Sequence, residues 1–259
     1  MEYLKIEKKK EYVIVQLNRG KVNAINDKMV AEIRQTFQAL EKDDEVKGVI
    51  LTGIPNFFSA GLDVIELFDY DEPRMREFFI AFSSMHVEMA RFTKPFICAI
   101  TGHSPAGGCV MAIAADYRIM ANDNPKFSIG LNEIAVNIQI SRNLIEAYAY
   151  WLGRSKANEF VLDGKLLNAQ EAFDHGLVNH ICPLDEVLER AEKKMQQYLL
   201  ADPNIFKNTK NKLRNNWLAN LVFDESELEE AVNIWWNPEV RMRMSAFVHY
   251  LKNKSKSKV

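Results

Sequence analysis

The sequence lacks the features that mark secreted, membrane-spanning and nucleic-acid-binding proteins. Its 259 residues include three cysteines without paired spacing, which is typical of reduced core thiols. The longest apolar runs are too short to cross a bilayer. The formal net charge of −2 gives no reason to expect a nucleic-acid or anionic-membrane partner. The N-terminus shows neither a signal peptide nor an Arg-rich transit peptide. These absences predict a cytoplasmic protein with no nucleic-acid or membrane partner.

Several common catalytic signatures are also missing. Ser59 and His103 have no G-x-S-x-G context, which argues against a serine hydrolase triad. The histidines and cysteines do not show metal-ligand spacing, and there is no P-loop or dinucleotide fingerprint. We therefore predict no metal site and no separate cofactor.

What is present is an alternation of strand-like and helix-like segments. With 47% apolar and 26% charged residues, the composition is that of an ordinary globular protein. Short apolar runs alternate with segments whose apolar residues recur at helical spacing, which predicts an α/β architecture. After about residue 140 helical patterns dominate, and Trp217, Trp235 and Trp236 lie in a polar helical segment that we expect to pack on a partner or on the core. The predicted strands are 12–17, 48–52, 96–100, 116–120 and 126–129, and the main predicted helices are 27–40, 72–92 and 109–115.

Two glycine-containing turns each lie between a predicted strand and a predicted helix. Phe58-Ser-Ala-Gly61 follows the strand 48–52, and Thr101–Cys109 follows the strand 96–100. Such turns expose backbone N–H groups, and two of them aimed at one point can polarise a carbonyl oxygen. Glycine by itself favours the simpler interpretation, in which both glycines only permit tight turns.

Four blocks of the sequence are informative in combination. They are Phe58-Ser-Ala-Gly-Leu-Asp63, Gly102-His-Ser-Pro-Ala-Gly-Gly-Cys109, Ile129-Gly-Leu-Asn-Glu133 and a fourth that runs from Asp163-Gly-Lys to His175-Gly-Leu-Val-Asn179. Together they resemble the crotonase (enoyl-CoA hydratase/isomerase) superfamily. The third block is similar to that of Δ3,Δ2-enoyl-CoA isomerases.

The resemblance implies a fold and an assembly. The expected fold is a crotonase, ClpP-like spiral of ββα units, followed by a C-terminal helical region that assembles trimers, sometimes paired into hexamers. We therefore expect a spiral core over residues 1–200, a helical region over residues 201–259, and a homotrimer or hexamer.

The resemblance also assigns the site. Backbone N–H groups of Leu62 and Gly107 are expected to hold the thioester oxygen of an acyl-CoA, so CoA enters only as part of the substrate. The segment 21–25 matches the one whose backbone receives the adenine part of CoA. For Lys21 a plain surface position stays open, and for Asp63 helix capping stays open. The residues expected to contact the substrate are Lys21, Ala24, Ala60, Gly61, Asp63, Val64 and Asn132.

The expected base is Glu133, although the residues alone would favour an exposed loop edge for this carboxylate. The resemblance reverses that preference. Hydratases of the superfamily carry a second glutamate where this chain has Val110, and adding water needs two carboxylates. One carboxylate suffices to move a proton from C2 to C4, so the pattern favours isomerisation of a 3-enoyl-CoA to a 2-enoyl-CoA.

One segment departs from the family pattern, so other functions stay open. The segment Asn137-Ile-Gln-Ile-Ser141 replaces the glycine and proline-containing turn usual in the family, and it is expected to line the acyl pocket. Other enolate chemistry on the same fold therefore stays open, namely hydration, thioester hydrolysis or decarboxylation. So does a catalytically silent CoA-binding protein.

Overall fold

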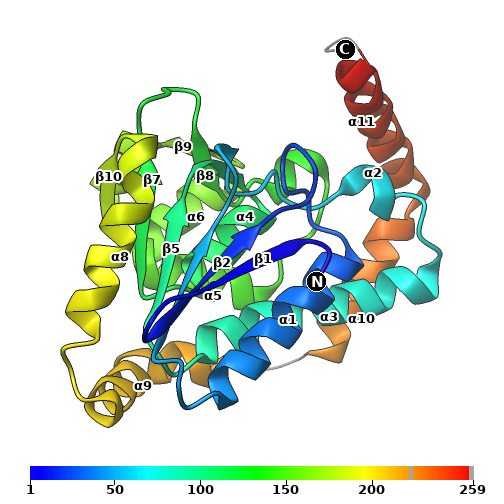
Figure 1. Cartoon of the computed structure of the whole chain (residues 1–259). Helices are drawn as coiled ribbons and strands as arrows, with labels where there is room; N and C mark the ends of the chain where they lie inside the picture. Colours follow the sequence, from blue (N-terminus) through cyan, green and yellow to red (C-terminus); the bar gives the residue numbers. More distant parts are fainter. Residues whose placement is uncertain (222–223, 257–259) are drawn as a thin grey trace.

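A six-stranded sheet forms the centre of the molecule (Figure 1). The computed structural model describes residues 1–221 and 224–256. In the order β1-β2-β3-β5-β7-β10, the β1–β2 pair is antiparallel and the other pairs are parallel. Every residue of β3 and β5 is buried, as expected of parallel strands covered on both faces. The strands are β1 (Leu4–Lys8), β2 (Tyr12–Leu17), β3 (Gly48–Thr52), β5 (Phe96–Ile100), β7 (Tyr117–Ala121) and β10 (His180–Cys182).

A second, four-stranded sheet stands beside the first, in the order β4-β6-β8-β9. Its strands are β4 (Asn56–Phe57), β6 (Gly102–Pro105), β8 (Ser128–Gly130) and β9 (Leu167–Asn168). The chain passes from β3 to β4, from β5 to β6 and from β7 to β8, each time moving from the large sheet to the small one before it enters a helical segment. This repetition confirms the predicted spiral of ββα units.

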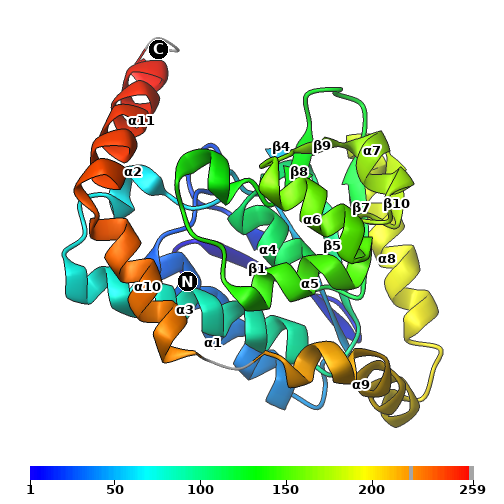
Figure 2. The ribbon, with the colours of Figure 1, turned by 180° about the vertical axis from the view of Figure 1, so that it is seen from behind.

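Helices cover both sheets. Helix α8 packs across β3, β5 and β7, whereas α1 packs on α3 and α5 packs on α4 (Figure 2). The Asn26 side chain accepts the Met29 N–H, so Asn26 is the N-cap of α1. These helices are α1 (Asp27–Lys42), α2 (Val64–Leu67), α3 (Glu72–Arg91), α4 (Gly107–Ile113), α5 (Arg142–Leu152), α6 (Arg154–Leu162), α7 (Ala169–Asp174) and α8 (Val187–Tyr198), with 3-10 turns η1 (Glu133–Val136) and η2 (Leu184–Glu186).

In the described part of the chain α8 is followed by α9 (Pro203–Ala219), α10 (Glu225–Trp236) and α11 (Pro238–Lys256). Helix α10 packs on α3, where Trp235 meets Phe79 edge-on, and Trp217 of α9 stacks on Tyr150. Two of the three C-terminal tryptophans are therefore buried against the chain's own core, one of the two outcomes expected from the sequence. Helix α11 extends away from the body of the molecule (Figure 1).

Buried charges join α9 to the large sheet. Lys210 Nζ lies 2.7 Å from one oxygen of Asp116, and Arg214 Nη2 lies 2.8 Å from the other. All three side chains are almost fully buried. A buried cation without a partner is costly, so this carboxylate stabilises the docking of α9.

The sequence patterns missed short strands and merged one of them into a turn. The prediction ran directly from the strand 96–100 through a glycine turn to a helix beginning at Cys109. Instead, β6 pairs with β4, and α4 begins at Gly107. At Gly102 a Cβ atom would lie 2.2 Å from the carbonyl oxygen of Asn56, so only glycine permits this close pairing. Strands β4 and β9 have two residues each, too few to show any periodicity.

Within the described part of the chain, no helix combines the length and the apolar character needed to cross a membrane.

Candidate active site

The two glycine turns meet in space, although α2, α3 and β5 separate them in sequence. Gly61 has φ +83°, and a Cβ built on it would lie 3.1 Å from Cβ of Ala106 and 3.4 Å from the backbone N of Gly107. A Cβ built on Gly107 would lie 3.5 Å from Cα of Gly61. The glycines therefore permit a backbone approach that larger residues would prevent.

The predicted N–H donors lie at this junction. Ile25 N–H donates to the Gly61 carbonyl, and Asp63 N–H donates to the Ile25 carbonyl, so the backbone on both sides of Leu62 is held. Gly107 is the first residue of α4, where an N–H has no acceptor in its own helix. Among the described residues, neither the Leu62 nor the Gly107 amide donates to another protein group.

Ala106 holds the second turn in a strained conformation. Its φ of +47° and ψ of −117° lie in a region that favours glycine. Ala106 N–H donates to the Gly130 carbonyl of β8, and its own carbonyl accepts the Val110 N–H. These bonds fix the residue immediately before the Gly107 amide.

Glu133 begins η1, and its side chain faces inward. The residue is 5% exposed, so the exposed loop edge favoured by the residues alone is wrong. Its Oε2 atom is buried and has no hydrogen-bond partner among the described residues. Burial disfavours the charged form and raises the pKa of Glu133 to about 7. A carboxyl group with this pKa can both take and give a proton near neutral pH.

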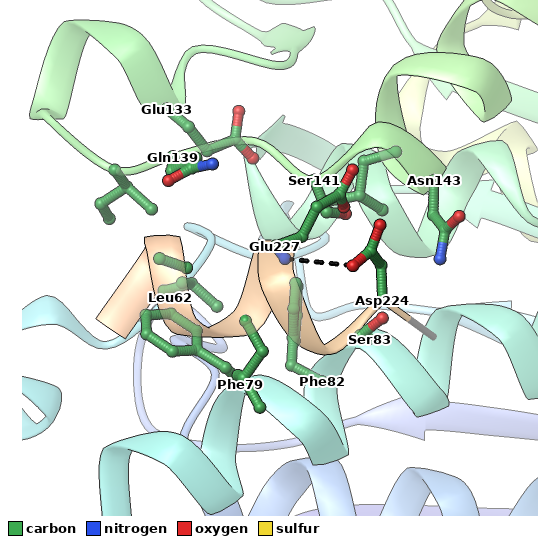
Figure 3. Close-up of a pocket in the computed structure, with 14 residues that line it drawn as sticks. Leu62, Phe79, Phe82, Ser83, Glu133, Gln139, Ser141, Asn143, Asp224 and Glu227 are labelled. Carbon is green, nitrogen blue, oxygen red and sulfur yellow. Dashed lines mark hydrogen bonds between the residues drawn. The ribbon is translucent and has the colours of Figure 1, made fainter. Parts of the chain in front are cut away.

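Glu133 and Leu62 line the same pocket (Figure 3). In Figure 3, Glu133 lies across the pocket from Leu62 and Phe79, while Asp224 and Asn143 lie at the other end. The segment 137–141 contributes three side chains to this pocket, and the binding of an acyl group there stays a prediction. The remaining lining residues are Phe82, Ser83, Ile138, Gln139, Ser141, Leu144, Glu227, Leu228 and Ala231.

The contribution of α10 to the pocket was not predicted. Asp224 caps α10 by accepting the N–H groups of Ser226 and Glu227. Glu227 accepts the backbone N–H of Arg142 and pairs with its guanidinium at 3.2 Å. The Asp224-Glu-Ser-Glu227 stretch reads as a helix start, but nothing local to it indicates that the helix reaches a pocket built by α3 and η1.

The segment 21–25 lies against the first glycine turn. Ala60 N–H donates to the Val22 carbonyl at 2.8 Å, and the Ala24 carbonyl accepts from the Arg19 guanidinium at 2.6 Å. Lys21 is exposed beside them. The structure thus brings Lys21, Ala24, Ala60 and Gly61 together.

Three other predicted contact residues have clear structural positions. Asp63 caps α2 by accepting the Glu66 N–H and forms an ion pair with Arg19 at 2.7 Å, so the capping interpretation is confirmed. Val64 begins α2 and is buried. Asn132 immediately precedes Glu133, and its Oδ1 is buried without a partner among the described residues. Contact of these residues with a substrate stays a prediction.

Val110 is fully buried in α4, and its carbonyl lies 3.0 Å from Nδ1 of His86. Burial lowers the pKa of His86 to about 4, so this ring is neutral.

Ser59 and His103, the serine and histidine considered for a hydrolase triad, have other partners. Ser59 Oγ donates to the Asn23 carbonyl, whereas His103 lies beside Ser128. The described residues hold no group of three or more His, Cys, Asp or Glu side chains arranged to bind a metal ion.

Comparison with known proteins identifies the family of this chain. The family model described as "Enoyl-CoA hydratase/isomerase" matches residues 7–254. The mitochondrial enoyl-CoA delta isomerase 1 of Mus musculus is 29% identical over 243 residues, which cover 93% of this chain and 84% of that protein. A probable mitochondrial enoyl-CoA hydratase of Dictyostelium discoideum is 32% identical over 192 residues, which cover 74% of this chain and 68% of that protein. The crystal structure of human mitochondrial delta3-delta2-enoyl-CoA isomerase superposes with a TM-score of 0.92 at 25% identity, covering 97% of this chain and 99% of that one.

Fold and site together define an α/β protein with two touching glycine turns and a buried carboxyl group in a pocket that Leu62 also lines. The chain belongs to the enoyl-CoA hydratase/isomerase family and has its crotonase fold.

Proposed function

We propose that the protein is an acyl-CoA enzyme that moves a double bond of an enoyl-CoA from position 3 to position 2. The observation that carries this proposal is Glu133, a buried carboxyl group with an unpartnered oxygen in the same pocket as Leu62. The likeness to an isomerase over nearly the whole chain supports it.

In the proposed mechanism the backbone amides of Leu62 and Gly107 donate to the thioester oxygen. Loss of a proton from C2 places negative charge on this oxygen, so the two donors stabilise the enolate more than they stabilise the substrate. Each such donor contributes about 10²–10³ in rate. The touching glycine turns and the strained Ala106 support a rigid arrangement of these amides.

Glu133 then acts as both base and acid. Its carboxylate takes the C2 proton while the C–H electrons delocalise into the thioester as a dienolate. The same carboxyl group returns the proton to C4 as the double bond settles between C2 and C3. The reaction moves one proton and one double bond and needs no oxidant or reductant. CoA is therefore required only as part of the substrate.

Isomerisation is favoured over hydration because, among the described residues that line the pocket, one carboxyl group is uncommitted. Val110 stands where the resemblance places the second glutamate of hydratases, and a valine cannot activate water. Asp224 and Glu227 also line the pocket, but Asp224 caps α10 and Glu227 binds Arg142. Addition of water needs a second carboxylate that is free to work with Glu133.

For CoA itself we propose contacts along the segment 21–25 and the first glycine turn. The backbone around Ala24 would receive the adenine, and exposed Lys21 would meet a phosphate. Ala60, Gly61, Asp63 and Val64 would follow the pantetheine arm toward the carbonyl, and Asn132 would lie beside the substrate. The proximity of the segment 21–25 to Ala60 and Gly61 supports this path.

The first test replaces Glu133 by Gln and measures conversion of 3-enoyl-CoA thioesters. We expect kcat to fall by about 10²–10⁴ because the proton carrier is lost while the shape of the pocket is kept. Glu189→Gln on the exposed face of α8 is the control and should retain full activity. Near-normal turnover by Glu133→Gln would remove Glu133 from the mechanism.

A panel of acyl-CoAs separates the alternatives on the same fold. Hydration, hydrolysis or decarboxylation of one member by the wild type, without any double-bond shift, would replace isomerisation as the reaction. Tight binding of the whole panel without turnover would point to a silent CoA-binding protein, for which the unusual segment 137–141 would be the cause.

We further propose that the chain works as a homotrimer or hexamer. All three proteins named above are mitochondrial by name, whereas the sequence alone predicts a cytoplasmic protein. The compartment stays a prediction, which a fluorescent fusion in the native cell would test.

A further inference from the structure

Asn23 is an uncharged side chain with no exposed surface, in the segment whose backbone is expected to receive the adenine part of CoA. Its φ of +50° is unusual for a residue other than glycine. Its Nδ2 group donates to the Leu17 carbonyl at the end of β2 at 3.1 Å, and to the Phe58 carbonyl of the first glycine turn at 3.0 Å. Its Oδ1 accepts the Arg19 N–H at 2.8 Å. The side chain therefore ties the first glycine turn to the large sheet.

Ser59 continues this connection into the turn. Its hydroxyl donates to the Asn23 carbonyl at 2.7 Å and accepts the Gly61 N–H at 3.1 Å. The residue is fully buried, so water does not compete for these bonds.

The remaining amides around Leu62 are held in the same way. Ala60 N–H donates to the Val22 carbonyl, and Asp63 N–H donates to the Ile25 carbonyl. Among the residues that the structure describes, the segment 22–25 or Ser59 thus accepts every amide from Ala60 to Asp63 except that of Leu62. This pattern leaves the Leu62 N–H for a ligand and fixes the peptide that carries it.

From this network we infer that Asn23, acting with Ser59, is a positioning residue for the Leu62 amide. The inference rests on the proposed role of that amide as a donor to the thioester oxygen. A donor that shifts by about 1 Å can cost 10² in rate, although nothing that touches the substrate has been removed. Asn23 acts through the backbone of the turn and touches no reacting atom.

The test uses Asn23→Gly, which keeps the left-handed backbone accessible and removes the side chain. We expect kcat to fall about 10- to 100-fold while KM changes much less, because the amide stabilises mainly the enolate. Ser59→Ala, which removes only the hydroxyl, should act in the same direction and serves if Asn23→Gly does not fold.

The matched control is Asn179→Ala. Asn179 also holds a backbone amide, that of Arg118 at 2.9 Å, but it lies at the opposite edge of the six-stranded sheet from β2. We expect this variant to lose stability and to keep its kcat.

A spectroscopic readout separates positioning from general damage. The carbonyl stretch of bound 2-enoyl-CoA, measured by difference infrared spectroscopy, should lie below its value in water for the wild type and for Asn179→Ala. In Asn23→Gly and Ser59→Ala it should return toward the value in water. Variants that bind the thioester and keep both the shifted stretch and the wild-type kcat would overturn the inference.

This readout needs binding but no turnover. If the wild type shifts the carbonyl stretch and never isomerises a 3-enoyl-CoA, the proposed reaction fails, and the role of Asn23 is still decided by the spectra of its variants.

Discussion

At the scale of single residues, Glu133 decides the chemistry through its surroundings. A glutamate in water is ionised at neutral pH and is a weak base. Here burial raises the pKa of Glu133 to about 7, and its own backbone N–H opposes the shift. The environment therefore matches the proton affinity of the group to the operating pH.

This pKa predicts how activity depends on pH. Glu133 must be ionised to take the C2 proton, so kcat/KM should rise with pH and level off above an apparent pKa of about 7. Measurement of kcat/KM from pH 5 to pH 9 gives this apparent pKa. A profile that is flat down to pH 5 would show that Glu133 titrates like an ordinary glutamate or plays no part.

The same shift predicts how stability depends on pH. Because the folded-state pKa is raised, from 4.5 to about 7, the native state loses stability as pH rises between these values. The full cost, roughly 3 kcal/mol, is reached above pH 7. Glu133→Gln should therefore unfold at higher urea than the wild type at pH 8, and the difference should shrink toward pH 5.

At the scale of secondary-structure elements, the site depends on two turns that touch. Gly61 and Gly107 bring together segments that follow β4 and β6, which are neighbours in the small sheet. The sheet sets where the turns end, and the glycines permit the last approach.

Replacing Gly61 by Ala should push these turns apart. The new Cβ would meet Ala106 Cβ and Pro105 O, each at 3.1 Å, and the residue would keep a φ of +83°. Gly153→Ala is the matched control, because Gly153 has φ +75° but open space around its Cβ position.

We expect both variants to lose about 1 kcal/mol or more of unfolding free energy through backbone strain. Only Gly61→Ala should lose kcat, by at least about 10-fold, because only there does an amide donor move. Equal kcat values for the two variants would contradict the proposed place of Leu62 and Gly107 in the site.

At the scale of the whole molecule, the C-terminal helices complete the pocket. Helix α10 packs on α3 and brings Asp224, Glu227, Leu228 and Ala231 to the pocket that holds Glu133. The pocket therefore requires segments from three distant parts of the sequence. The proposed division into residues 1–200 and 201–259 separates regions of the chain that share this one site.

Large apolar side chains on the outer faces of α9 and α11 support the proposed assembly. Ile205, Leu213 and Met242 are each about two-thirds exposed in the single chain. We expect a sedimentation mass of about three or six times the 29.8 kDa chain mass, independent of salt concentration because apolar contacts are not screened. A mass near 29.8 kDa at micromolar concentration would contradict it.

The sequence by itself determined the strands and helices with clear periodicity and the two glycine turns. These features are local: β3 and β5 are continuous apolar runs, and each glycine stands next to its own strand and helix. The family resemblance then supplied the relation between the blocks and the identity of the candidate base.

Only the tertiary structure decided the burial of Glu133, the contact between the two turns, and the parts that α10 and Asn23 play. Each depends on segments far apart in the chain, and burial, which sets the pKa of Glu133, is a property of everything that surrounds the side chain. Short strands such as β4 and β9 exist only through pairing with β6 and β8, since two residues carry no sequence pattern of their own.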